Sequence, residues 1–557
     1  FRKRDTRSKD HVPAMYTMNP KTEEVRNYNS AVPRVKDWDA WATGSFFTQT
    51  LGWEGNLRDE HHIGVMVGQD YQEFYNDNFQ AYKEGFYDNY HTDLNSASGQ
   101  VNAQATGASS REKLVSVFGR LSYDYKQRYL VSAVFRYDGS SRLAPDHRWA
   151  FFPSVSLAWR IDQENFMKNA EFIDQLKPRF SWGKMGNQAV LLYSYLSSVN
   201  TSGYDYSFDG TKYGGAAISA LADNTITWEE TTSYDAGIDF SAFGNRVLFS
   251  ADWFLKRTEG ILRTVNLPSQ VGDLSGPKSN VGVVDNKGIE LSLTLRDSWG
   301  DFSAGISGNF SYTRNEIVDL NGETEINGRL ICKEGYPINS WYLLETDGVF
   351  QNQSEIDNAQ AVYGNRANLR PGYVKYVNQN NDNTIDGNDR VIAGNTIPRF
   401  AYGFNLNFGW KGFAVEAQFQ GVGDVSVYPS SNMAFGLYNG AGLTKQWVRD
   451  SWSATNRNTE YPLLTTYPEA GENFQNSTLW LQDASYLRLK NIQLSYTFPK
   501  QLVGRIGIKG LQVYVSGQNL VTFSDFKIWD PEISISQVNL FSYPILKTIS
   551  FGINLTL

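Results

Sequence analysis

The clearest pattern in the chain is a strict alternation of apolar and polar residues over residues 288–313, GIELSLTLRDSWGDFSAGISGNFSYT. Aliphatic residues stand at every second place from Ile289 to Leu295, and after a short turn the alternation resumes from Phe302 to Tyr312. Successive side chains of a strand lie on opposite faces of its sheet. The stretch therefore predicts an antiparallel hairpin that is apolar on one face and polar on the other.

Roughly fifteen segments show this alternation. They are residues 47–53, 63–67, 115–125, 129–137, 155–159, 180–182, 234–240, 247–253, 289–296, 302–313, 400–410, 413–419, 487–498, 511–515 and 549–557. Between these segments, short turns alternate with mostly long loops, and the longest loop covers residues 316–398. Loops of that length are unusual in a compact soluble domain. Short turns at one rim and long loops at the other are typical of outer-membrane barrels.

The pattern predicts an all-β fold, an antiparallel transmembrane β-barrel with long extracellular loops and short periplasmic turns. A soluble β-sandwich would place strands about every 8–12 residues without this asymmetry. We expect the first turn at Gly55 and Asn56 and a Tyr-, Asn- and Asp-rich loop over residues 75–110. The apolar parity slips between Leu489 and Ile492, which predicts a β-bulge.

The strand count and the start of the chain suggest a part of a longer protein. A closed bacterial barrel needs an even number of strands, and fifteen leaves one over. The chain also opens without a start methionine or a signal peptide. Residues 1–557 are therefore predicted to be the C-terminal part of a barrel.

Composition narrows the functional classes. The chain of 557 residues carries a formal net charge of −8, and it has no run of about 18 apolar residues that would form a transmembrane helix. The mild acidity argues against a nucleic-acid partner. The sequence contains no HExxH, GxSxG, phosphate-loop or dinucleotide motif, so we do not expect an enzyme. Aromatic residues make up 14%, which suits the girdles of a membrane barrel.

Four motifs resemble the SusC/RagA family of TonB-dependent outer-membrane transporters of Bacteroidetes-type bacteria. They are NTITWEET with GIDF (residues 224–231 and 237–240), NVGVVDNKGIE (280–290), PGYVKY with DGNDR and PRF (371–376, 386–390 and 398–400), and SYLRLKNI (485–492). They recur in the family's order and spacing, and the resemblance extends from about residue 47 to residue 557.

The resemblance implies a 22-stranded barrel, an N-terminal plug folded inside it, and a SusD-like surface lipoprotein over the extracellular loops. The fifteen strands would be the last two-thirds of that barrel, embedded in outer-membrane lipid. The plug and its TonB-contacting box have no counterpart in this sequence. The parent would import oligosaccharides or peptides handed over by the lipoprotein, with energy from TonB.

Residues 378–389 have the ligand spacing of a calcium loop. Counting Asn378 as the first position, oxygen-bearing residues stand at positions 1, 3, 5, 7, 9 and 12, as in an EF-hand. They are Asn378, Asn380, Asp382, Thr384 through its carbonyl, Asp386 and Asp389. Asn378 is neutral where Asp is usual, and Asn383 replaces the usual Gly. We expect structural Ca²⁺ here, and the alternative is a loop that caps itself with side-chain hydrogen bonds.

Two further sets of residues are candidates for substrate contact. Polar residues of the predicted strands would line the lumen, namely Glu290, Arg296, Asn405, Asn407, Glu416 and Gln418. Aromatic residues of the long loops are weaker candidates for stacking on sugar rings or gripping peptides, namely Tyr204, Tyr206, Trp341 and Tyr342. Two other functions stay open at this point: a passive porin or surface adhesin, and a secreted calcium-dependent glycan-binding β-protein.

Overall fold

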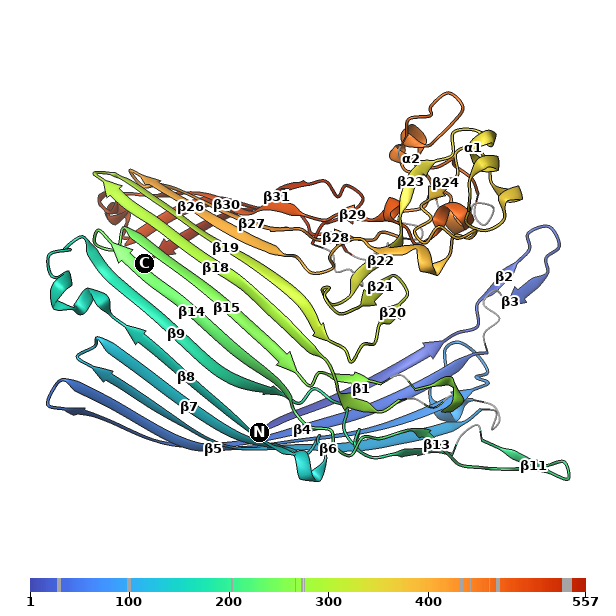
Figure 1. Cartoon of the computed structure of the whole chain (residues 1–557), viewed down its shortest axis with the longest axis horizontal. Coiled ribbons are helices and arrows are strands. Elements are labelled where there is room, and N and C mark those ends of the chain that lie inside the picture. Colours follow the sequence, from blue (N-terminus) through green and yellow to red (C-terminus); the bar gives the residue numbers. More distant parts are fainter. Residues whose placement is uncertain are drawn as a thin grey trace.

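The computed structural model describes residues 1–27, 32–97, 102–201, 204–265, 267–271, 274, 276–430, 434–440, 442–459, 461–466, 471–532 and 543–557. Within them, sixteen antiparallel strands form one continuous sheet (Figure 1). Each strand pairs with the sheet strands that precede and follow it along the chain, so the sheet is an up-and-down meander. The all-β antiparallel class predicted from the alternation is confirmed.

The strands of this sheet are the longest elements of the molecule. They are β1 (Arg2–Val12), β4 (Arg34–Leu57), β5 (His61–Glu84), β6 (Gln104–Tyr125), β7 (Tyr129–Ser140), β8 (Trp149–Trp159), β9 (Ile173–Asn187), β14 (Glu229–Ala242), β15 (Val247–Glu259), β18 (Val283–Trp299), β19 (Phe302–Asp319), β26 (Phe400–Trp410), β27 (Phe413–Gly423), β30 (Tyr486–Thr497), β31 (Gly510–Ser524) and β32 (Thr548–Thr556).

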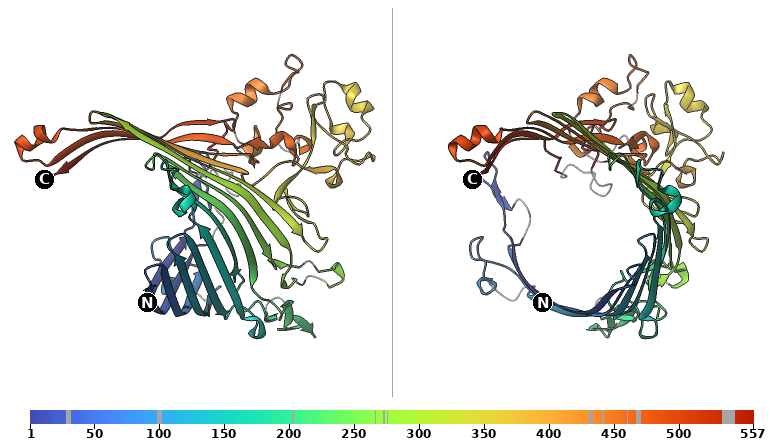
Figure 2. Two further views of the ribbon diagram at one scale, coloured as in Figure 1. Left: turned by 60° about the vertical axis from the view of Figure 1, so that its left-hand side comes forward. Right: turned by 90° about the vertical axis from the view of Figure 1, so that its left-hand side faces the viewer.

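The sheet is a curved wall around a central space, with β1 at one end of the wall and β32 at the other (Figure 2). Among the described residues, no strand pairs with the outer edge of β1 or of β32. Among the helices of the same residues, none combines the length and the apolar character that a membrane span requires.

The apolar positions of the alternation lie on one face of the sheet, and no second layer covers them. Ile289, Leu291, Leu293 and Leu295 are between 37% and 45% exposed. The register extends such positions into rows across neighbouring strands. An uncovered apolar face of this kind is the lipid-facing surface of a barrel wall. We call it the outer face and the opposite, polar face the inner face.

Several strands are longer than the alternation predicts. β5 runs to Glu84 and β6 begins at Gln104, so much of the loop predicted over residues 75–110 is strand. Polar residues occupy both faces in this part of the wall, so the alternation disappears although the ladder of backbone hydrogen bonds continues. The first turn follows Leu57 and does not lie at Gly55 and Asn56 as predicted.

The sheet has sixteen strands instead of fifteen because the alternation misses β1. Its sequence, RKRDTRSKDHV, places polar residues on both faces. It nevertheless pairs with β4 without interruption, from Arg2 opposite Gly44 to Val12 opposite Arg34. Sixteen is an even number, so the argument from a leftover strand was wrong.

The β-bulge predicted in the strand before the last hairpin is confirmed. Leu489 pairs with Phe419 and Asn491 pairs with Gln418, which leaves Lys490 without a partner in the ladder. The same irregularity appears on the other side of β30, toward β31. The bulge accounts for the slip of the apolar parity at this point of the sequence.

Two long connections, residues 320–399 and 424–485, fold together beside one rim of the wall, and we call them the loop body (Figure 1). The first of them is the loop predicted over residues 316–398. The elements of the loop body are β20 (Glu325–Asn327), β21 (Leu330–Cys332), β22 (Ser340–Leu344), β23 (Thr346–Val349), α1 (Gln353–Asn358), β24 (Val374–Tyr376), β25 (Arg390–Ile392), β28 (Ser426–Val427), α2 (Lys445–Asp450) and β29 (Gln482–Asp483).

Three other connections at this rim contain small hairpins, and the turns at the opposite rim are short apart from two that hold brief helices. The hairpins are β2 (Tyr16–Met18) with β3 (Val25–Asn27), β10 (Ser198–Asn200) with β13 (Ala217–Ala220), β11 (Tyr206–Phe208) with β12 (Thr211–Tyr213), and β16 (Leu262–Thr264) with β17 (Lys278–Asn280). The helix α3 (Lys500–Val503) lies in the turn between β30 and β31. The predicted asymmetry between the two rims is therefore present.

Candidate functional site

The predicted lumen residues lie on the inner face, at strand positions that alternate with the apolar outer residues. The register places Asn405 opposite Gln418 and Asn407 opposite Glu416. The Asn405 amide donates to the hydroxyl of Ser307 on the neighbouring strand, 3.3 Å away. Glu290 and Arg296 occupy the same face of β18. The structure thus gathers these six side chains on one polar surface.

A charged network that the sequence analysis missed crosses three strands of this inner face. The Arg179 guanidinium on β9 donates to Asp235 at 3.3 Å, to Asp239 at 3.3 Å and to Asp252 at 2.7 Å. Lys177 forms a second ion pair with Asp239, at 2.8 Å. Within this network, two cations thus pair with three carboxylates.

A hollow of about 450 Å³ adjoins this network. Arg120, Ser122, Arg179 and Asp235 line it in part. Mixed charges and hydroxyls of this kind offer hydrogen bonds to a polar occupant. The hollow lies toward the short-turn half of the wall, away from the loop body.

A second inner-face network lies on β4 to β7, nearer the long-loop rim. Arg136 donates to Asp138 at 2.8 Å and to the Ser116 hydroxyl at 2.7 Å. Thr48 donates to the carboxylate of Asp70, which lies 4.0 Å from the same guanidinium. Asp70, Ser116 and Asp138 are buried, so their partners compensate the lost hydration.

At the long-loop rim, residues of the connections after β7 and β9 pack with the wall strand β8 in a hydrophobic cluster. Its members, all buried, are Leu143, Ala144, Phe152, Val190, Ile226 and Trp228. Arg142 fixes this cluster to the wall through a bidentate ion pair with Glu112, at 2.6 and 2.7 Å. The connections after β7 and β9 are therefore packed against the wall at this part of the rim.

The connection after β31 is held to the wall by buried charges. Arg488, whose side chain is 3% exposed, donates to the Thr522 hydroxyl at 2.9 Å and to Asp530 at 2.7 Å. Glu532 bridges Arg488 at 3.1 Å and Lys490 at 2.7 Å. The resemblance gave no hint of either this network or that of Arg179. For the Arg179 network, a usable signal was the presence of charged residues at polar positions of adjacent predicted strands, whereas Asp530 and Glu532 lie outside the predicted strands.

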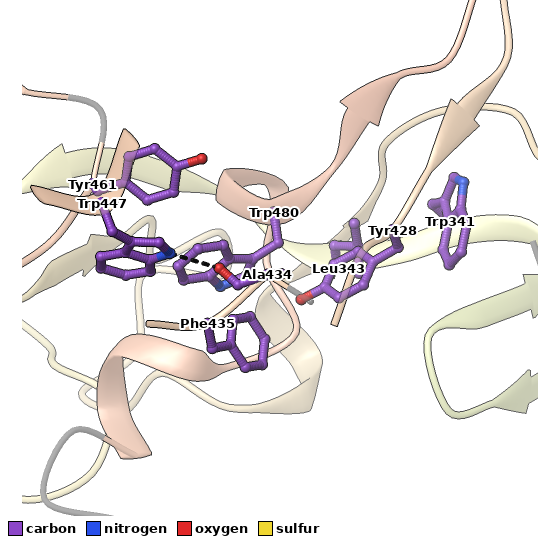
Figure 3. Packing of buried hydrophobic residues seen from close by; sticks show 8 residues of the cluster. All are labelled: Trp341, Leu343, Tyr428, Ala434, Phe435, Trp447, Tyr461 and Trp480. Atoms are coloured by element: carbon purple, nitrogen blue, oxygen red, sulfur yellow. Dashed lines mark hydrogen bonds between the residues drawn. The ribbon is translucent and has the colours of Figure 1, made fainter. Parts of the chain in front are cut away.

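The loop body has its own aromatic core, drawn in Figure 3. Its buried members come from both connections and are Trp341, Leu343, Tyr428, Ala434, Phe435, Trp447, Tyr461 and Trp480. The ring of Trp480 lies 4.8 Å from that of Phe435 and 6.0 Å from that of Trp447. The Trp447 indole donates to the Ala434 carbonyl at 2.8 Å. The ring of Trp341, 5.7 Å from that of Tyr428, joins the two connections into one folded unit.

The four aromatic candidates for substrate contact are not brought together. Trp341 is 5% exposed, and its indole donates to the Ser426 carbonyl, so its ring serves the core of the loop body. Tyr342 is half-buried beneath the Arg390 guanidinium. Tyr204 and Tyr206, 41% and 60% exposed, lie at the β11–β12 hairpin, which is separate from the loop body in both figures of the whole chain.

The loop over residues 378–389 holds itself by side-chain hydrogen bonds. Asp382 accepts from the backbone N–H of Thr384 at 2.7 Å and from the Asn380 amide at 2.8 Å. Asp389, fully buried, accepts from the backbone N–H groups of Gln379 and Asp386 at 2.8 and 2.9 Å. This is the self-capping arrangement that the sequence left open as an alternative.

One oxygen of this loop is left without a partner. Asn378 Oδ1, at the first position of the calcium spacing, is buried and accepts no hydrogen bond. The backbone N–H of Thr384 lowers the pKa of Asp382, which keeps that carboxylate ionised at neutral pH. The residue of this loop with a left-handed backbone conformation is Asn381, and not Asn383, which stands where an EF-hand has its glycine. No three His, Cys, Asp or Glu side chains of the described segments gather as a metal site would, so Ca²⁺ stays a prediction.

A curved antiparallel sheet with an apolar outer face, a charged inner face and packed connections at one rim defines the wall of a transmembrane β-barrel. Comparison with known proteins agrees. The family described as TonB dependent receptor-like, beta-barrel matches residues 10–520, and the chain belongs to this family of outer-membrane transporters, which are not enzymes. The secreted alternative is inconsistent with this assignment.

The relatives place the chain on the SusC/RagA side of the family. TonB-dependent receptor P26 of Formosa agariphila is 31% identical over 91% of this chain and 52% of its own length. TonB-dependent receptor SusC of Bacteroides thetaiotaomicron is 29% identical over 88% of this chain and 48% of its own. The chain thus spans about half the length of the curated relatives it matches.

A solved structure confirms the fold. The RagAB peptide importer in its open-open state superimposes with a TM-score of 0.80 at 24% identity, over 99% of this chain and 58% of that one. At this level of identity the agreement concerns the arrangement of the strands. The wall described above is therefore the barrel portion of a TonB-dependent receptor.

Proposed function

We propose that this chain is the C-terminal barrel segment of a SusC-like importer that takes up oligosaccharides or peptides by energy from TonB. The observation that carries the proposal is a sheet whose end strands, β1 and β32, each have only one partner strand among the described residues, in a chain that spans about half the length of its relatives. An unpaired strand edge within lipid leaves backbone N–H and C=O groups without partners, at a cost of several kcal/mol per group. Further strands of a longer protein, to a total of 22, would satisfy the edges of β1 and β32.

The inner face supports a gated channel. Ion pairs such as those of Arg179 and Arg136 present a charged, hydrogen-bonding wall to whatever fills the central space. A plug folded inside the barrel would pack against this wall and the adjoining hollow. Release of the plug by TonB would then open the passage for cargo.

The long-loop rim supports a surface partner. The loop body is a prefolded unit with a core of its own, and such a unit offers a rigid docking platform. A SusD-like lipoprotein would sit on it and hand over the cargo. RagAB is described as a peptide transporter, and this chain's cargo is proposed only as an oligosaccharide or a peptide.

The test uses the full-length gene product in its native host. We expect uptake of labelled oligosaccharides or peptides to stop when the TonB-contacting box is deleted, and a surface lipoprotein to co-purify in mild detergent. Uptake that persists without the box would indicate a passive porin instead. Surface binding without uptake would indicate an adhesin.

We propose in addition that Ca²⁺ stabilises the loop over residues 378–389. Two observations support the proposal. The side-chain oxygen of Asn378, at position 1 of the calcium spacing, accepts no hydrogen bond, and the carboxylate of Asp382, at position 5, is ionised. Asp386 and the Thr384 carbonyl would complete the set. The metal would have a structural role only, and its test closes the Discussion.

A further inference from the structure

On the outer face, the apolar surface gives way to charge two residues beyond the last apolar row on β18 and β19, and four residues beyond it on β15. The register defines three successive rows across these neighbouring strands. The rows are Trp253–Ile289–Tyr312, then Leu255–Lys287–Arg314, then Arg257–Asp285–Glu316. The first row is apolar or aromatic, and the second carries two cations side by side.

The vertical position of these rows follows from strand geometry. Trp299, 59% exposed, marks the short-turn end of the outer face of β18, ten residues from Ile289. Ten residues at about 3.3 Å each, on a strand tilted by about 40°, span about 25 Å, which equals the apolar band of a barrel. Lys287 and Arg314 therefore lie immediately outside the band, at the level of the lipid headgroups.

The charges of these rows do not balance. Arg257 forms two hydrogen bonds with Asp285, at 2.8 and 2.9 Å, and thereby uses both of its oxygens. Lys287 and Arg314 both lie 3.3 Å from the same oxygen of Glu316, Oε2. Within these three rows, three cations thus share two carboxylates, and Glu259, outside the rows, also acts on Arg257. Glu259 stands one row further from the apolar band, beside Val283.

The cations also project further than their counter-ions. The side chains of Lys287 and Arg314 are 43% and 51% exposed, whereas Glu316 is 25% and Asp285 9% exposed. Like charges directly opposite each other on neighbouring strands repel. An anion between Lys287 and Arg314 would relieve that repulsion without displacing Glu316.

We propose that Lys287 and Arg314 form a binding site for the phosphate group of a membrane lipid in the leaflet at the long-loop rim. The phosphate would bridge the two cations through charge-assisted hydrogen bonds. The acyl chains would extend over Ile289 and Tyr312 toward the short-turn rim. The continuity of the site with the apolar band selects a lipid phosphate over a free one. A bound lipid would also anchor β15, β18 and β19 at a fixed height in the membrane.

The test measures binding of monophosphorylated lipid A to the full-length transporter in nonionic detergent, by native mass spectrometry. Each basic residue near an anionic surface is worth about fivefold in affinity, so the K287A/R314A variant should bind about 25-fold more weakly. Glu316→Gln removes the shared counter-charge and should strengthen binding. Dephosphorylated lipid A should bind the parent and the K287A/R314A variant equally.

The matched control is Lys184→Ala on β9, because Lys184 stands on the same rim but is neutralised by its own partner, Glu230, at 2.9 Å. Its affinity for the lipid should change less than twofold. Equal losses for Lys184→Ala and K287A/R314A, or weaker binding by Glu316→Gln, would overturn the site. Competition by millimolar inorganic phosphate with the affinity of the lipid would overturn the lipid as its source.

Discussion

The wall and the loop body reach stability in opposite ways. On the wall, Leu291 and Leu293 remain about two-fifths exposed, because their partner is lipid and not protein. In the loop body, Trp480 and Leu343 are 2% and 0% exposed, within a core of their own. The backbone ladder holds the wall in every strand pair, while side-chain packing holds the loop body. One chain thus combines a membrane scaffold with a fold of the water-soluble type.

This contrast explains where charge is placed. Level with the apolar band, the wall keeps its ion pairs on the inner face, where Arg179 serves three carboxylates, and outer-face pairs such as Lys287 with Glu316 lie beyond the band. The loop body buries neutral phenols such as Tyr428, and its buried carboxylate, Asp389, accepts hydrogen bonds from two backbone N–H groups. Substitutions and pH should therefore affect the two regions separately.

The largest effect is expected for Trp480→Ala in the loop body. Truncating a buried tryptophan costs about 3–5 kcal/mol. Trp480 contacts four aromatic rings of its own connection, in a core that also contains Trp341 and Leu343 of the other connection. Hydrogen exchange of the full-length protein should show loss of protection in the loop body alone. The wall should retain its resistance to unfolding in sodium dodecyl sulfate.

Val448→Ala is the matched control for this change. Val448 lies on α2 of the same body but is 69% exposed, so its truncation should leave protection unchanged. If Trp480→Ala also unfolded the wall, the two regions would not be separable units and the contrast would fail.

The next effect is expected on the outer face of the wall. Leu293→Arg puts a charge into the apolar band, where arginine costs about 2–4 kcal/mol near the bilayer midplane. Ser292→Arg puts the same charge on the inner face and should cost far less. Urea unfolding of the two variants in lipid vesicles measures the difference. Equal destabilisation by both would contradict the assignment of the two faces.

The sequence predicts the wall well because lipid and water impose a period of two on its strands. The hairpin over residues 288–313 is found as expected. The prediction failed where that constraint ends: β1 is polar on both faces, and β5 continues to Glu84 beyond the apolar band. Strand pairing there depends on the neighbouring strand, which no local pattern encodes.

The loop body and the inner-face networks could not be predicted from local sequence patterns, for a different reason. The core around Trp447 and Trp480 joins residues from two separate connections, and Arg488 meets Asp530 across 42 positions of sequence. Trp341 shows the consequence. Its aromatic character suggested contact with cargo, whereas the structure uses its ring for packing.

A smaller effect is expected in the loop body at alkaline pH. Burial raises the pKa of Tyr428 from its usual 10.0 to about 12, because the phenolate would lose its hydration. A raised pKa contributes stability that is complete below pH 10 and is lost as the pH rises through about 12. Two pKa units correspond to about 2–3 kcal/mol.

Near-ultraviolet circular dichroism between pH 9 and pH 12.5, at constant salt, would follow this loss. Tyr428→Phe should remove most of the pH dependence of the loop body while leaving the signal of the wall unchanged. A transition of the same size in the phenylalanine variant would assign the effect to other groups, such as Tyr376, whose pKa burial also raises.

The smallest effect concerns Ca²⁺ at residues 378–389, within the loop body. A ligand present at ten times its dissociation constant stabilises the folded state by about 1.4 kcal/mol, so Ca²⁺ should raise the unfolding midpoint of the loop body slightly and leave the wall unchanged. Asp382→Asn should abolish that rise, because a hard cation prefers charged oxygen ligands. Asp357→Asn, on α1 of the same body, is the control for loss of a carboxylate elsewhere. If Ca²⁺ stabilised the parent and Asp382→Asn equally, the hydrogen bonds that Asp382 receives from Thr384 and Asn380 would be its whole role, and the loop would be self-capped.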